Sequence, residues 1–362
     1  MAKRRAKGEG TIWHSKTDGR WKAQITLFNG TRRGKTGKTQ KEVKDWLLEQ
    51  RRKLSTGLIV ADDQIRLGDF LDRYLAAASH KLRSTTLRAH SNMVRIHIIP
   101  SLGNIRLVDL QPYHIQEFYT QKLEEGLSRR SVQYIHAILH KALNQALRWE
   151  LVNRNVTDLV DAPRPKRKTF RTWTADEVKR FLAAVEGHQW YPIYVIAAYT
   201  GLRQGEVLGL HKEDVDLKSG VIQVRHQITY VLGDGLHITE PKTEASRRPV
   251  TLPETALNVL KTYLKDFKGD KLIFTTRSGR PISPRNIVRH FKSVIAAEGL
   301  PEIRFHDLRH THATLLLAAG VHPKIVQERL GHSSITLTLD TYSHVIPSLQ
   351  TEAADQFEEI LA

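Results

Sequence analysis

A short, proline-rich and strongly basic stretch divides this chain of 362 residues. It reads Asp-Ala-Pro-Arg-Pro-Lys-Arg-Lys-Thr-Phe over residues 161–170. Proline has no backbone N–H and fixes φ, and like charges repel one another, so this stretch is a poor helix and a poor core segment. Such a stretch is typical of an interdomain linker that crosses a phosphate backbone, in keeping with the two or three domains that the length of the chain predicts. We expect an interdomain linker over residues 161–172.

Basic residues concentrate at the N-terminal end. Residues 1–60 hold 16 Lys and Arg against five Asp and Glu, so they carry +11 of the formal net charge of +18. Such an excess indicates a polyanionic partner, either nucleic acid or an anionic membrane surface. No apolar run approaches the roughly 20 residues of a transmembrane helix, and no apolar signal segment follows the basic start. Cysteine is absent as well, which excludes disulfides and thiolate sites. From these features together we expect a cytoplasmic protein with no membrane partner.

Local patterns in residues 1–60 predict a small sheet with one helix on its back. Strand-like segments are expected at Thr11–Trp13, Trp21–Leu27 and Thr31–Arg33. Turns are expected at Gly19, Gly30, Gly34 and Gly37. Thr39-Gln-Lys-Glu42 is a capping-box pattern that opens a helix to about Leu54. We interpret the basic face of this sheet as a DNA-reading surface, and a merely solvated surface is the alternative.

Residues 61–160 show helical spacing of apolar side chains. Four helices are expected, over 67–75, from Ser84 or Thr85 to Ile99 with Pro100 as the stop, from Leu110 to Leu123, and from a Ser128 cap to about Leu147. This pattern predicts a compact four-helix unit.

Residues 173–362 mix helices and strands. A helix capped by Thr174 runs to Val185, a second covers 191–199, and a third opens near Arg203. Segments 221–231 and 236–239 form a hairpin around Gly233-Asp-Gly235, to which 248–252 adds a third strand, and helices follow to the C-terminus. The expected fold is therefore multidomain and mainly α with small β-sheets: an N-terminal sheet-plus-helix module (1–60), a four-helix domain (61–160) and a mixed α+β domain (173–362).

Five short motifs in the last domain stand out by their order and spacing. They are Thr200-Gly-Leu-Arg203 with Glu206, Pro241-Lys-Thr243 followed by Ser246-Arg-Arg248, His306-Asp-Leu-Arg309, Leu330-Gly-His332, and Leu339-Asp-Thr-Tyr342-Ser-His344. Each motif is weak alone, because His-x-x-Arg also occurs at His80 and Arg83. The order and spacing of all five motifs together are informative.

The set describes a site for attack on a phosphodiester. Arg203 and Arg309 can each bind non-bridging oxygens through a two-pronged fork and neutralise the charge of the transition state. Tyr342 supplies a phenolic nucleophile that would conserve the bond energy in a phosphotyrosine. Lys242 can protonate the departing 5′ oxygen, while His306 and His332 position protons and phosphate. The exchange of one phosphodiester for another requires no cofactor and no metal.

Metal chemistry is the weaker interpretation. No Asp/Glu pair has a spacing suited to two magnesium ions, which disfavours a two-metal nuclease. A histidine site would have to use residues next to Arg309, whose charge opposes a cation. We expect the neighbouring histidines His310, His312 and His344 to support the structure or the site residues.

At these motifs the last domain resembles the catalytic domain of the tyrosine recombinases, specifically the phage-type integrases. The resemblance rests on Thr200-Gly-Leu-Arg-Gln-Gly-Glu-Val-Leu-Gly-Leu210, on Asp214-Val-Asp216, and on His306-Asp-Leu-Arg-His-Thr-His-Ala-Thr314 with Leu330-Gly-His332 and Tyr342. It implies the catalytic set Arg203, Lys242, His306, Arg309, His332 and Tyr342, with no cofactor and no metal. His211 departs from relatives that carry a tryptophan near the first arginine, and we expect only a packing change there.

The resemblance also implies partners. The four-helix unit is similar to a core-type DNA-binding domain, and residues 1–60 are similar to an arm-type module, so double-stranded DNA with core-type and arm-type attachment sites is expected. A homotetramer on DNA, a directionality factor and a DNA-bending host protein are implied as well, on the nucleoid of a bacterial cell. The activity implied is site-specific integration or excision of a mobile element or phage genome through a 3′-phosphotyrosyl intermediate.

Two other functions stay open at this point. One is a type IB topoisomerase, which shares the catalytic residues, and the other is a non-catalytic DNA-binding protein on the same fold. The tail also has two interpretations. Its amphipathic spacing of Val345, Leu349, Ala353, Phe357, Ile360 and Leu361 predicts a helix that docks either on its own domain or, as the family suggests, on a neighbouring subunit.

Overall fold

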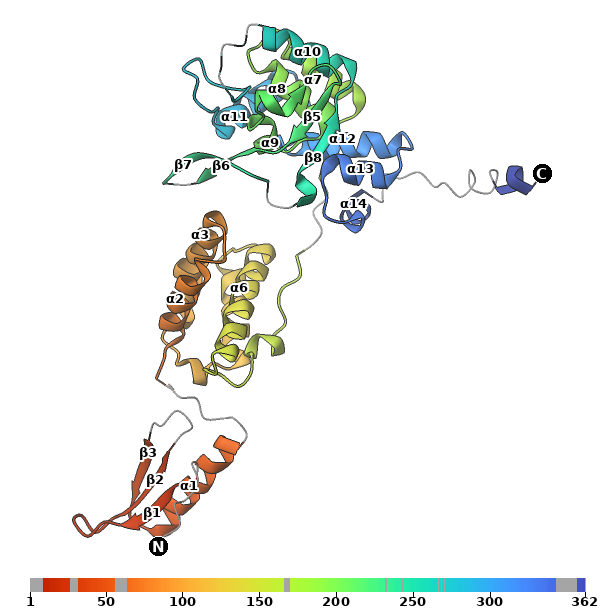
Figure 1. Cartoon of the computed structure of the whole chain (residues 1–362). Coiled ribbons are helices and arrows are strands. Elements are labelled where there is room, and N and C mark those ends of the chain that lie inside the picture. Colours follow the sequence, from red (N-terminus) through yellow and green to blue (C-terminus); the bar gives the residue numbers. More distant parts are fainter. Residues whose placement is uncertain are drawn as a thin grey trace. The chain divides into compact units, whose positions relative to one another are not determined.

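The computed structural model describes residues 9–26, 32–55, 64–165, 170–231, 233–241, 244–265, 267, 269, 271–342 and 357–361. The chain divides into two compact units, Met1–Arg167 and Lys168–Ala362. In Figure 1 the first unit runs from red to yellow and the second from green to blue. The helices are more numerous than the strands in both, which confirms the multidomain, mainly α fold with small sheets.

The first unit begins with an antiparallel sheet in the order β1-β2-β3. Its strands are β1 (Thr11–His14), β2 (Trp21–Thr26) and β3 (Arg32–Gly37), and helix α1 (Gln40–Ser55) packs against it. The alternation in β2 buries Ala23 and Ile25 against Val43 and Leu47 of α1, which forms a core of its own. Residues 27–31, including the expected Gly30 turn, lie outside the described residues.

Two glycines expected at turns lie instead inside β3. A side chain at Gly34 would come within 3.1 Å of the backbone oxygen of Ala23 on the neighbouring strand. A side chain at Gly37 would come within 2.8 Å of the Glu42 carboxylate at the start of α1. Gly34 therefore permits close approach within the sheet, and Gly37 permits close approach of α1, reasons that a local turn pattern does not reveal.

The rest of the first unit is helical. It contains α2 (Leu67–Ala78), α3 (Ser84–Met93), α5 (Pro112–Glu124) and α6 (Arg129–Arg148), and short 3-10 turns at Leu107–Asp109 and Val156–Leu159. Ser128 caps α6, since its hydroxyl accepts a hydrogen bond from the backbone N–H of Ser131 at 3.1 Å. One face of each main helix contributes to a shared apolar core, which confirms the expected four-helix unit.

The expected stop at Pro100 is wrong. After α3 the chain continues through a π-helical turn, Val94–Ile98, into α4 (Ile99–Leu102), so Pro100 lies in the first turn of α4. The wider turn pairs the N–H of Ile99 with the carbonyl of Val94, which lets the helix continue past a residue that has no N–H to donate. The cap expected from Ser84 is also wrong, because Arg83 precedes the helix and no side-chain cap forms.

The second unit is a mixed α+β domain. Its helices are α7 (Ala175–Ala184), α8 (Tyr191–Thr200), α9 (Gln204–Leu208), α10 (Glu254–Lys265), α11 (Pro284–Ala297), α12 (Asp307–Ala318), α13 (Pro323–Leu330) and α14 (Ile335–Tyr342), with 3-10 turns at Lys212–Asp214 and Glu244–Ser246. Thr174 and Glu177 form the capping box of α7. Helix α8 is buried almost all round and packs against α7, α10 and α12, so it is the centre of this unit.

The expected hairpin over 221–231 is two strands in two sheets. β5 (Val221–Val224) pairs with β4 (Val215–Asp216) and β8 (Arg248–Thr251), whereas β6 (Gln227–Val231) pairs with β7 (Gly235–Thr239) in a second sheet. The strand breaks where Nδ1 of His226 binds the buried Asp214 carboxylate at 2.8 Å. The third strand expected at 248–252 therefore extends the sheet of β5 and not the β6–β7 hairpin (Figure 1).

Most of the C-terminal tail lies outside the described residues, including Val345, Leu349 and Ala353. Residues 357–361 are helical, and Phe357, Ile360 and Leu361 are exposed. Within the described part of the chain, none of the helices has the length and apolar character needed to cross a membrane.

Candidate active site

The first arginine is placed by a glycine that ends a helix. Gly201 follows α8 with φ of +65°, the left-handed conformation that glycine adopts without strain. A side chain there would come within 2.8 Å of both His312 and Leu330. The chain turns at this point, and Arg203 becomes the residue that precedes α9. The Thr200-Gly-Leu-Arg203 motif is thus a helix end followed by a helix start.

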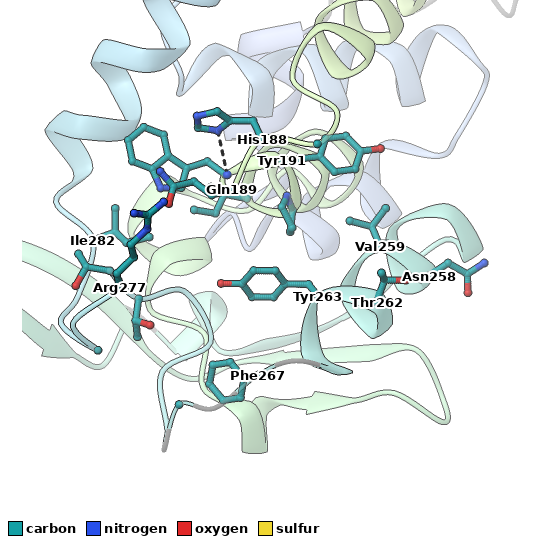
Figure 2. Close-up of a pocket in the computed structure, with 18 residues that line it drawn as sticks. His188, Gln189, Tyr191, Asn258, Val259, Thr262, Tyr263, Phe267, Arg277 and Ile282 are labelled. Atoms are coloured by element: carbon teal, nitrogen blue, oxygen red, sulfur yellow. Dashed lines mark hydrogen bonds between the residues drawn. The ribbon is translucent and has the colours of Figure 1, made fainter.

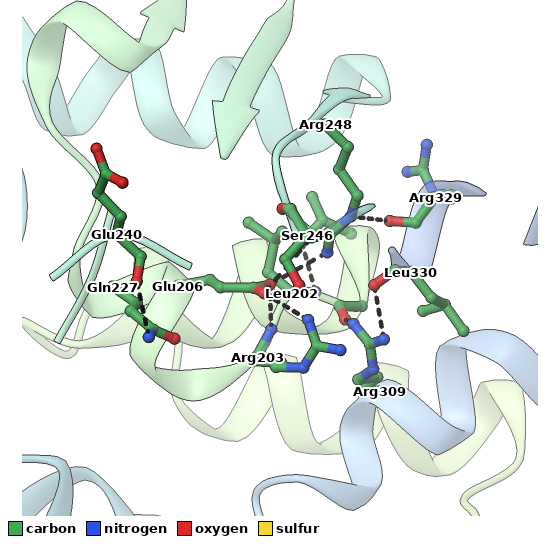
Figure 3. Close-up of polar contacts among 12 residues, drawn as sticks. Leu202, Arg203, Glu206, Gln227, Glu240, Ser246, Arg248, Arg309, Arg329 and Leu330 are labelled. Atoms are coloured by element: carbon green, nitrogen blue, oxygen red, sulfur yellow. Dashed lines mark hydrogen bonds and ion pairs between the residues drawn. The ribbon is translucent and has the colours of Figure 1, made fainter. Parts of the chain in front are cut away.

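Glu206 is the buried counterion of two arginines. Its Oε1 accepts a hydrogen bond from Nη1 of Arg203 at 2.6 Å, and its Oε2 accepts from Nη2 of Arg248 at 3.1 Å (Figure 3). Burial by itself raises the pKa of Glu206, but the charges of Arg248 and Arg203 outweigh it and lower that pKa below its ordinary value. Glu206 is therefore ionised at neutral pH and holds Arg203 in place.

Arg248 is part of the site's support and was not recognised as such from the sequence. It is 7% exposed, and it also donates to the backbone carbonyls of Arg329 at 2.6 Å and Ser246 at 3.0 Å. These bonds join β8 to the end of α13 (Figure 3). The only sequence signal was its place in the Ser246-Arg-Arg248 motif.

Arg309 joins three of the motifs. It lies in the first turn of α12 and is 3% exposed. Its Nη1 donates to the backbone carbonyl of Gly201 at 2.9 Å, and its Nη2 donates to that of Leu330 at 2.6 Å. Burial, followed by the charge of Arg203, lowers the pKa of Arg309, yet the guanidinium stays protonated at neutral pH.

His306 lies one residue before α12, at the N-cap position, and its own backbone is helical, with φ of −64° and ψ of −23°. Burial and then the charges of Arg309 and Arg203 lower its pKa. His306 is consequently neutral at pH 7.

His332 follows a second glycine in the left-handed conformation. Gly331 ends α13 with φ of +67°, and a side chain there would come within 2.7 Å of the backbone oxygen of Ala245. Nδ1 of His332 lies 2.9 Å from the hydroxyl of Thr338 on α14. Burial, with the charges of Arg309 and Arg203, lowers the pKa of His332 to about 3, so it too is neutral at pH 7.

Tyr342 is the last residue of α14 and has no exposed surface. Its hydroxyl lies 2.7 Å from Nδ1 of His310, the residue next to Arg309. Burial raises the pKa of Tyr342 to about 12, and the charge of Arg309 opposes that rise. The phenol therefore keeps its proton in the free protein and lies against the helix that carries Arg309.

The expected site residues are thus partly brought together. Arg203 and Arg309 are linked through the Thr200-Gly-Leu-Arg203 turn, and their charges lower the pKa values of both His306 and His332. Tyr342 contacts the same helix through His310. Lys242 lies outside the described residues, and the preceding Glu240 accepts a hydrogen bond at its backbone oxygen from Gln227 of β6 (Figure 3).

The supporting histidines behave in different ways. Nδ1 of His312 lies 3.0 Å from the carbonyl of Ala198, and its Nε2 accepts a hydrogen bond from Nε of Arg329 at 3.0 Å. Both ring nitrogens are thus used for structure, and His344 lies outside the described residues.

Another histidine pair lies near β6. His211, Glu213 and His226 place one ligand atom each within 4.8 Å of one another. The two rings stack with centroids 3.9 Å apart and planes only 27° from parallel, an arrangement in which the in-plane lone pairs of both rings do not meet at one ion. The ring of His211 thus stacks on that of His226, and the packing change expected at His211 stays a prediction.

The chemistry of this site is that of an anion-binding centre. Arg203, Arg309 and Arg248 bring three guanidiniums together around one carboxylate, Glu206. A guanidinium has five N–H groups, and Arg309 donates two of its own to backbone carbonyls. Neutral imidazoles and a phenol border this positive centre. Such a set of charges suits the binding of a phosphodiester.

A separate pocket of about 950 Å³ in the same unit does not contain the expected site residues. Figure 2 shows its lining, in which Tyr191, Tyr263 and Phe267 supply aromatic surface beside Arg277.

Comparison with known proteins agrees with the geometry. Residues 171–348 match the model of the phage integrase family, and residues 66–123 match that of the phage integrase N-terminal SAM-like domain. An integrase of Streptomyces ambofaciens is 30% identical over an alignment of 384 positions, gaps included, that covers 98% of this chain and 97% of that protein. A tyrosine recombinase XerC-like protein of Caldanaerobacter subterraneus subsp. tengcongensis is 28% identical over an alignment of 354 positions that covers 90% of each chain.

Solved structures are similar as well. The integrase of the transposon Tn1549, in complex with transposon right end DNA, matches with a TM-score of 0.71 and 25% identity over 82% of this chain and all of that chain. Lambda integrase, as a tetramer bound to a Holliday junction, matches in fold with a TM-score of 0.58 and 20% identity over 90% of this chain and 96% of that chain.

Proposed function

This chain belongs to the phage integrase family of tyrosine recombinases, and we propose that Tyr342 is the residue with which it cuts DNA. The protein is a DNA strand-transfer enzyme, a site-specific recombinase that cleaves and rejoins DNA. The observation that carries the proposal is the contact of the Tyr342 phenol with His310, directly after Arg309 on α12. This contact brings the nucleophile to the helix whose arginine joins the other motifs.

In the proposed reaction the phenolic oxygen of Tyr342 attacks the scissile phosphorus. A bond from phosphorus to the 5′ oxygen breaks, and a 3′-phosphotyrosine and a free 5′ hydroxyl result. Arg203 and Arg309 bind the non-bridging oxygens, and His306 and His332 donate hydrogen bonds to them in their neutral forms. Lys242 is the proposed acid that protonates the 5′ oxygen. Attack by a 5′ hydroxyl of a partner strand then reverses the chemistry and rejoins DNA.

We further propose that the chain works as a homotetramer on two duplexes. The tetramer of the similar lambda integrase on a Holliday junction supports this. Residues 1–60 are the proposed arm-type module, 61–160 the core-type domain, 161–172 the linker and 173–362 the catalytic domain. A directionality factor and a DNA-bending host protein complete the proposed assembly, which acts in the bacterial cytoplasm at the nucleoid on a phage genome or another mobile element.

The test is covalent trapping. The protein is incubated with a nicked suicide duplex that carries the site mapped from the ends of its own mobile element, in excess EDTA, and is run on a denaturing gel. We expect a protein–DNA adduct with the wild type and none with Tyr342→Phe, which keeps the ring and loses the attacking oxygen. An adduct with the variant would eliminate Tyr342 as nucleophile. A requirement for magnesium would favour a metal-dependent nuclease.

A further inference from the structure

The hydroxyl of Tyr342 has a single hydrogen-bond partner among the described residues, Nδ1 of His310 at 2.7 Å. The rest of the tyrosine is surrounded by apolar side chains: Ala313, Leu317, Val326 and Leu330. Neither His306 nor His332 forms this bond, although the motifs drew attention to those two. The proton of the proposed nucleophile therefore faces a histidine for which the sequence predicts only a supporting role.

The ring of His310 is held in a defined orientation. Phe170 stacks on one face, with ring centroids 4.1 Å apart and planes 20° from parallel. His306 meets the ring edge-on, with centroids 5.3 Å apart. The helical backbone of α12 fixes its Cα next to Arg309. Nδ1 is thereby aimed at the phenol.

The protonation states favour a hydrogen bond donated by the phenol. Burial lowers the pKa of His310 to about 4, and the charge of Arg309 acts in the same direction. His310 is therefore neutral at pH 7, with a lone pair on one ring nitrogen, while the phenol of Tyr342 is protonated. With the ring proton on Nε2, the Tyr342 hydroxyl donates to the Nδ1 lone pair.

We propose, on the basis of the proposed role of Tyr342, that His310 is a catalytic residue that accepts the phenolic proton during strand cleavage. As the oxygen of Tyr342 bonds to phosphorus, its proton moves to Nδ1 of His310 and gives an imidazolium. The bond from phosphorus to the 5′ oxygen breaks, and that oxygen takes a proton from the general acid. In the rejoining step His310 returns its proton to the departing phenol.

This transfer accompanies the attack and does not precede it. In the free protein the phenol is a much weaker acid than the imidazolium of His310, so complete ionisation before attack is unfavourable. Bond formation to phosphorus withdraws electrons from the phenolic oxygen, and the DNA phosphate adds a negative charge that stabilises an imidazolium nearby. General-base catalysis of this kind contributes about 10²–10⁴-fold to a rate.

Two other pairs of the same kind provide matched controls. Nδ1 of His290 lies 2.8 Å from the hydroxyl of Tyr194 in the core of the second unit. Nδ1 of His136 lies 2.9 Å from the hydroxyl of Tyr119 in the helical core. Both pairs lie outside the set of motifs, so they report what a His–Tyr hydrogen bond contributes to stability alone.

The experiment replaces each of these histidines by asparagine. The Oδ1 atom of asparagine can accept the phenol's hydrogen bond at the place of Nδ1, but it cannot take up a proton. Single-turnover cleavage of the suicide duplex is measured for His310→Asn, His290→Asn and His136→Asn. We expect His310→Asn to be at least about 100-fold slower, with unchanged DNA binding, and both controls to stay within a few-fold of the wild type.

A second substrate distinguishes a general-base role of His310 from a general-acid role. In a duplex with sulfur at the bridging 5′ position, the leaving thiolate needs no proton, so this substrate relieves the loss of a general acid and not that of a general base. The defect of His310→Asn is expected to persist on it. Free imidazole should partly restore cleavage by His310→Ala, in proportion to its neutral form, and this second variant gives the same test if His310→Asn fails to fold.

Near-normal cleavage by His310→Asn, or full recovery on the sulfur substrate, would overturn the proposal. Normal folding with no imidazole rescue of His310→Ala would count against it as well. Failure of the underlying function has a different signature, because Tyr342→Phe would then still form the covalent adduct.

Discussion

Arg309 donates a hydrogen bond to the backbone carbonyl of Gly201, 2.9 Å away, across 108 positions of the sequence. The second bond of Arg309, to the carbonyl of Leu330, adds the end of α13 to the same junction. Two helix ends, each closed by a glycine in the left-handed conformation, therefore meet one guanidinium. A residue proposed to bind phosphate thus also organises the fold around the phosphate site.

The two proposed phosphate-binding arginines should respond differently to lysine. Arg309→Lys loses both carbonyl bonds in a buried position, so we expect lower stability as well as cleavage slowed by about 100-fold or more. Arg203→Lys, at a residue whose side chain is 35% exposed, should slow cleavage to a similar extent with a smaller loss of stability.

Arg180→Lys is the matched control for both variants. Nη2 of Arg180 also donates to a backbone carbonyl, that of Glu298 at 2.8 Å, on the exposed surface. It should change neither property appreciably. Single-turnover cleavage and urea unfolding measure the two effects, and wild-type cleavage by Arg309→Lys would show that its fork is not needed.

Gly201→Ala should destabilise the second unit by more than the cost of placing an alanine in the left-handed backbone conformation. A left-handed backbone costs an alanine roughly 1–2 kcal/mol, and the new methyl group would also overlap His312 and Leu330 at 2.8 Å. Overpacking of that kind typically costs about 1–3 kcal/mol more.

Gly299→Ala serves as the control, because it measures the cost of the left-handed backbone conformation without any packing overlap. Gly299 has a similar φ of +60° and no atom within 4 Å of an added Cβ. The difference between the two variants in free energy of unfolding, from urea titrations, measures the packing around Gly201. Equal losses would mean that His312 and Leu330 move aside without cost.

Sequence reasoning succeeded where structure is local. The caps of α6 by Ser128 and of α7 by Thr174 each depend on a residue three positions further along the chain, and both caps are confirmed. It failed at Gly34, where the neighbouring strand decides, because that contact is not visible in a local pattern.

The same limit applies to the candidate site. The motifs identified residues by spacing, but the pairing of Glu206 with Arg248 spans 42 positions and that of His310 with Tyr342 spans 32. Which of several histidines meets the phenol depends on how α12 and α14 pack. The position of His310 directly after Arg309 was the only sequence signal, and it was interpreted as support.

Removal of residues 1–60 should separate core cleavage from integration. The deletion removes +11 of the +18 net charge and, on the proposed domain assignment, one of the two DNA-binding domains. When two DNA-binding domains are linked, binding of one raises the effective concentration of the other at its own site, so the pair binds DNA more tightly than either domain alone. Residues 61–362 should therefore still cleave a core site but fail at full integration.

The salt dependence of DNA binding checks the physical reason. Fewer phosphate contacts release fewer counterions, so a plot of log affinity against log salt concentration should be less steep for residues 61–362 than for the full chain. Full integration by the shortened protein, or an unchanged slope, would show that the module does not grip DNA in the way proposed.

The stability of the second unit should fall as the pH falls below 6.5, and His312 should account for part of that loss. Burial, with the nearby charge of Arg329, lowers the pKa of His312 to about 3 in the folded protein. In the unfolded chain the pKa returns to about 6.5, so between these values the unfolded state binds a proton that the folded state does not. The free energy of unfolding then decreases by up to about 1.4 kcal/mol for each pH unit and each such group. The pKa values of His310 and His332, lowered to about 4 and about 3, act in the same direction.

His312→Gln tests the contribution of a single group. The variant loses the bonds to Ala198 and Arg329, so it should be less stable than the wild type at pH 7.5. The variant no longer takes up a proton at this position on unfolding at pH 5, so its stability should depend less steeply on pH. Between pH 7.5 and 5.0 the free energy of unfolding should fall by about 2 kcal/mol more for the wild type than for the variant. Urea unfolding at several pH values gives both curves. Parallel curves would mean that His312 titrates alike in the folded and unfolded states, contrary to its burial between a carbonyl and a guanidinium.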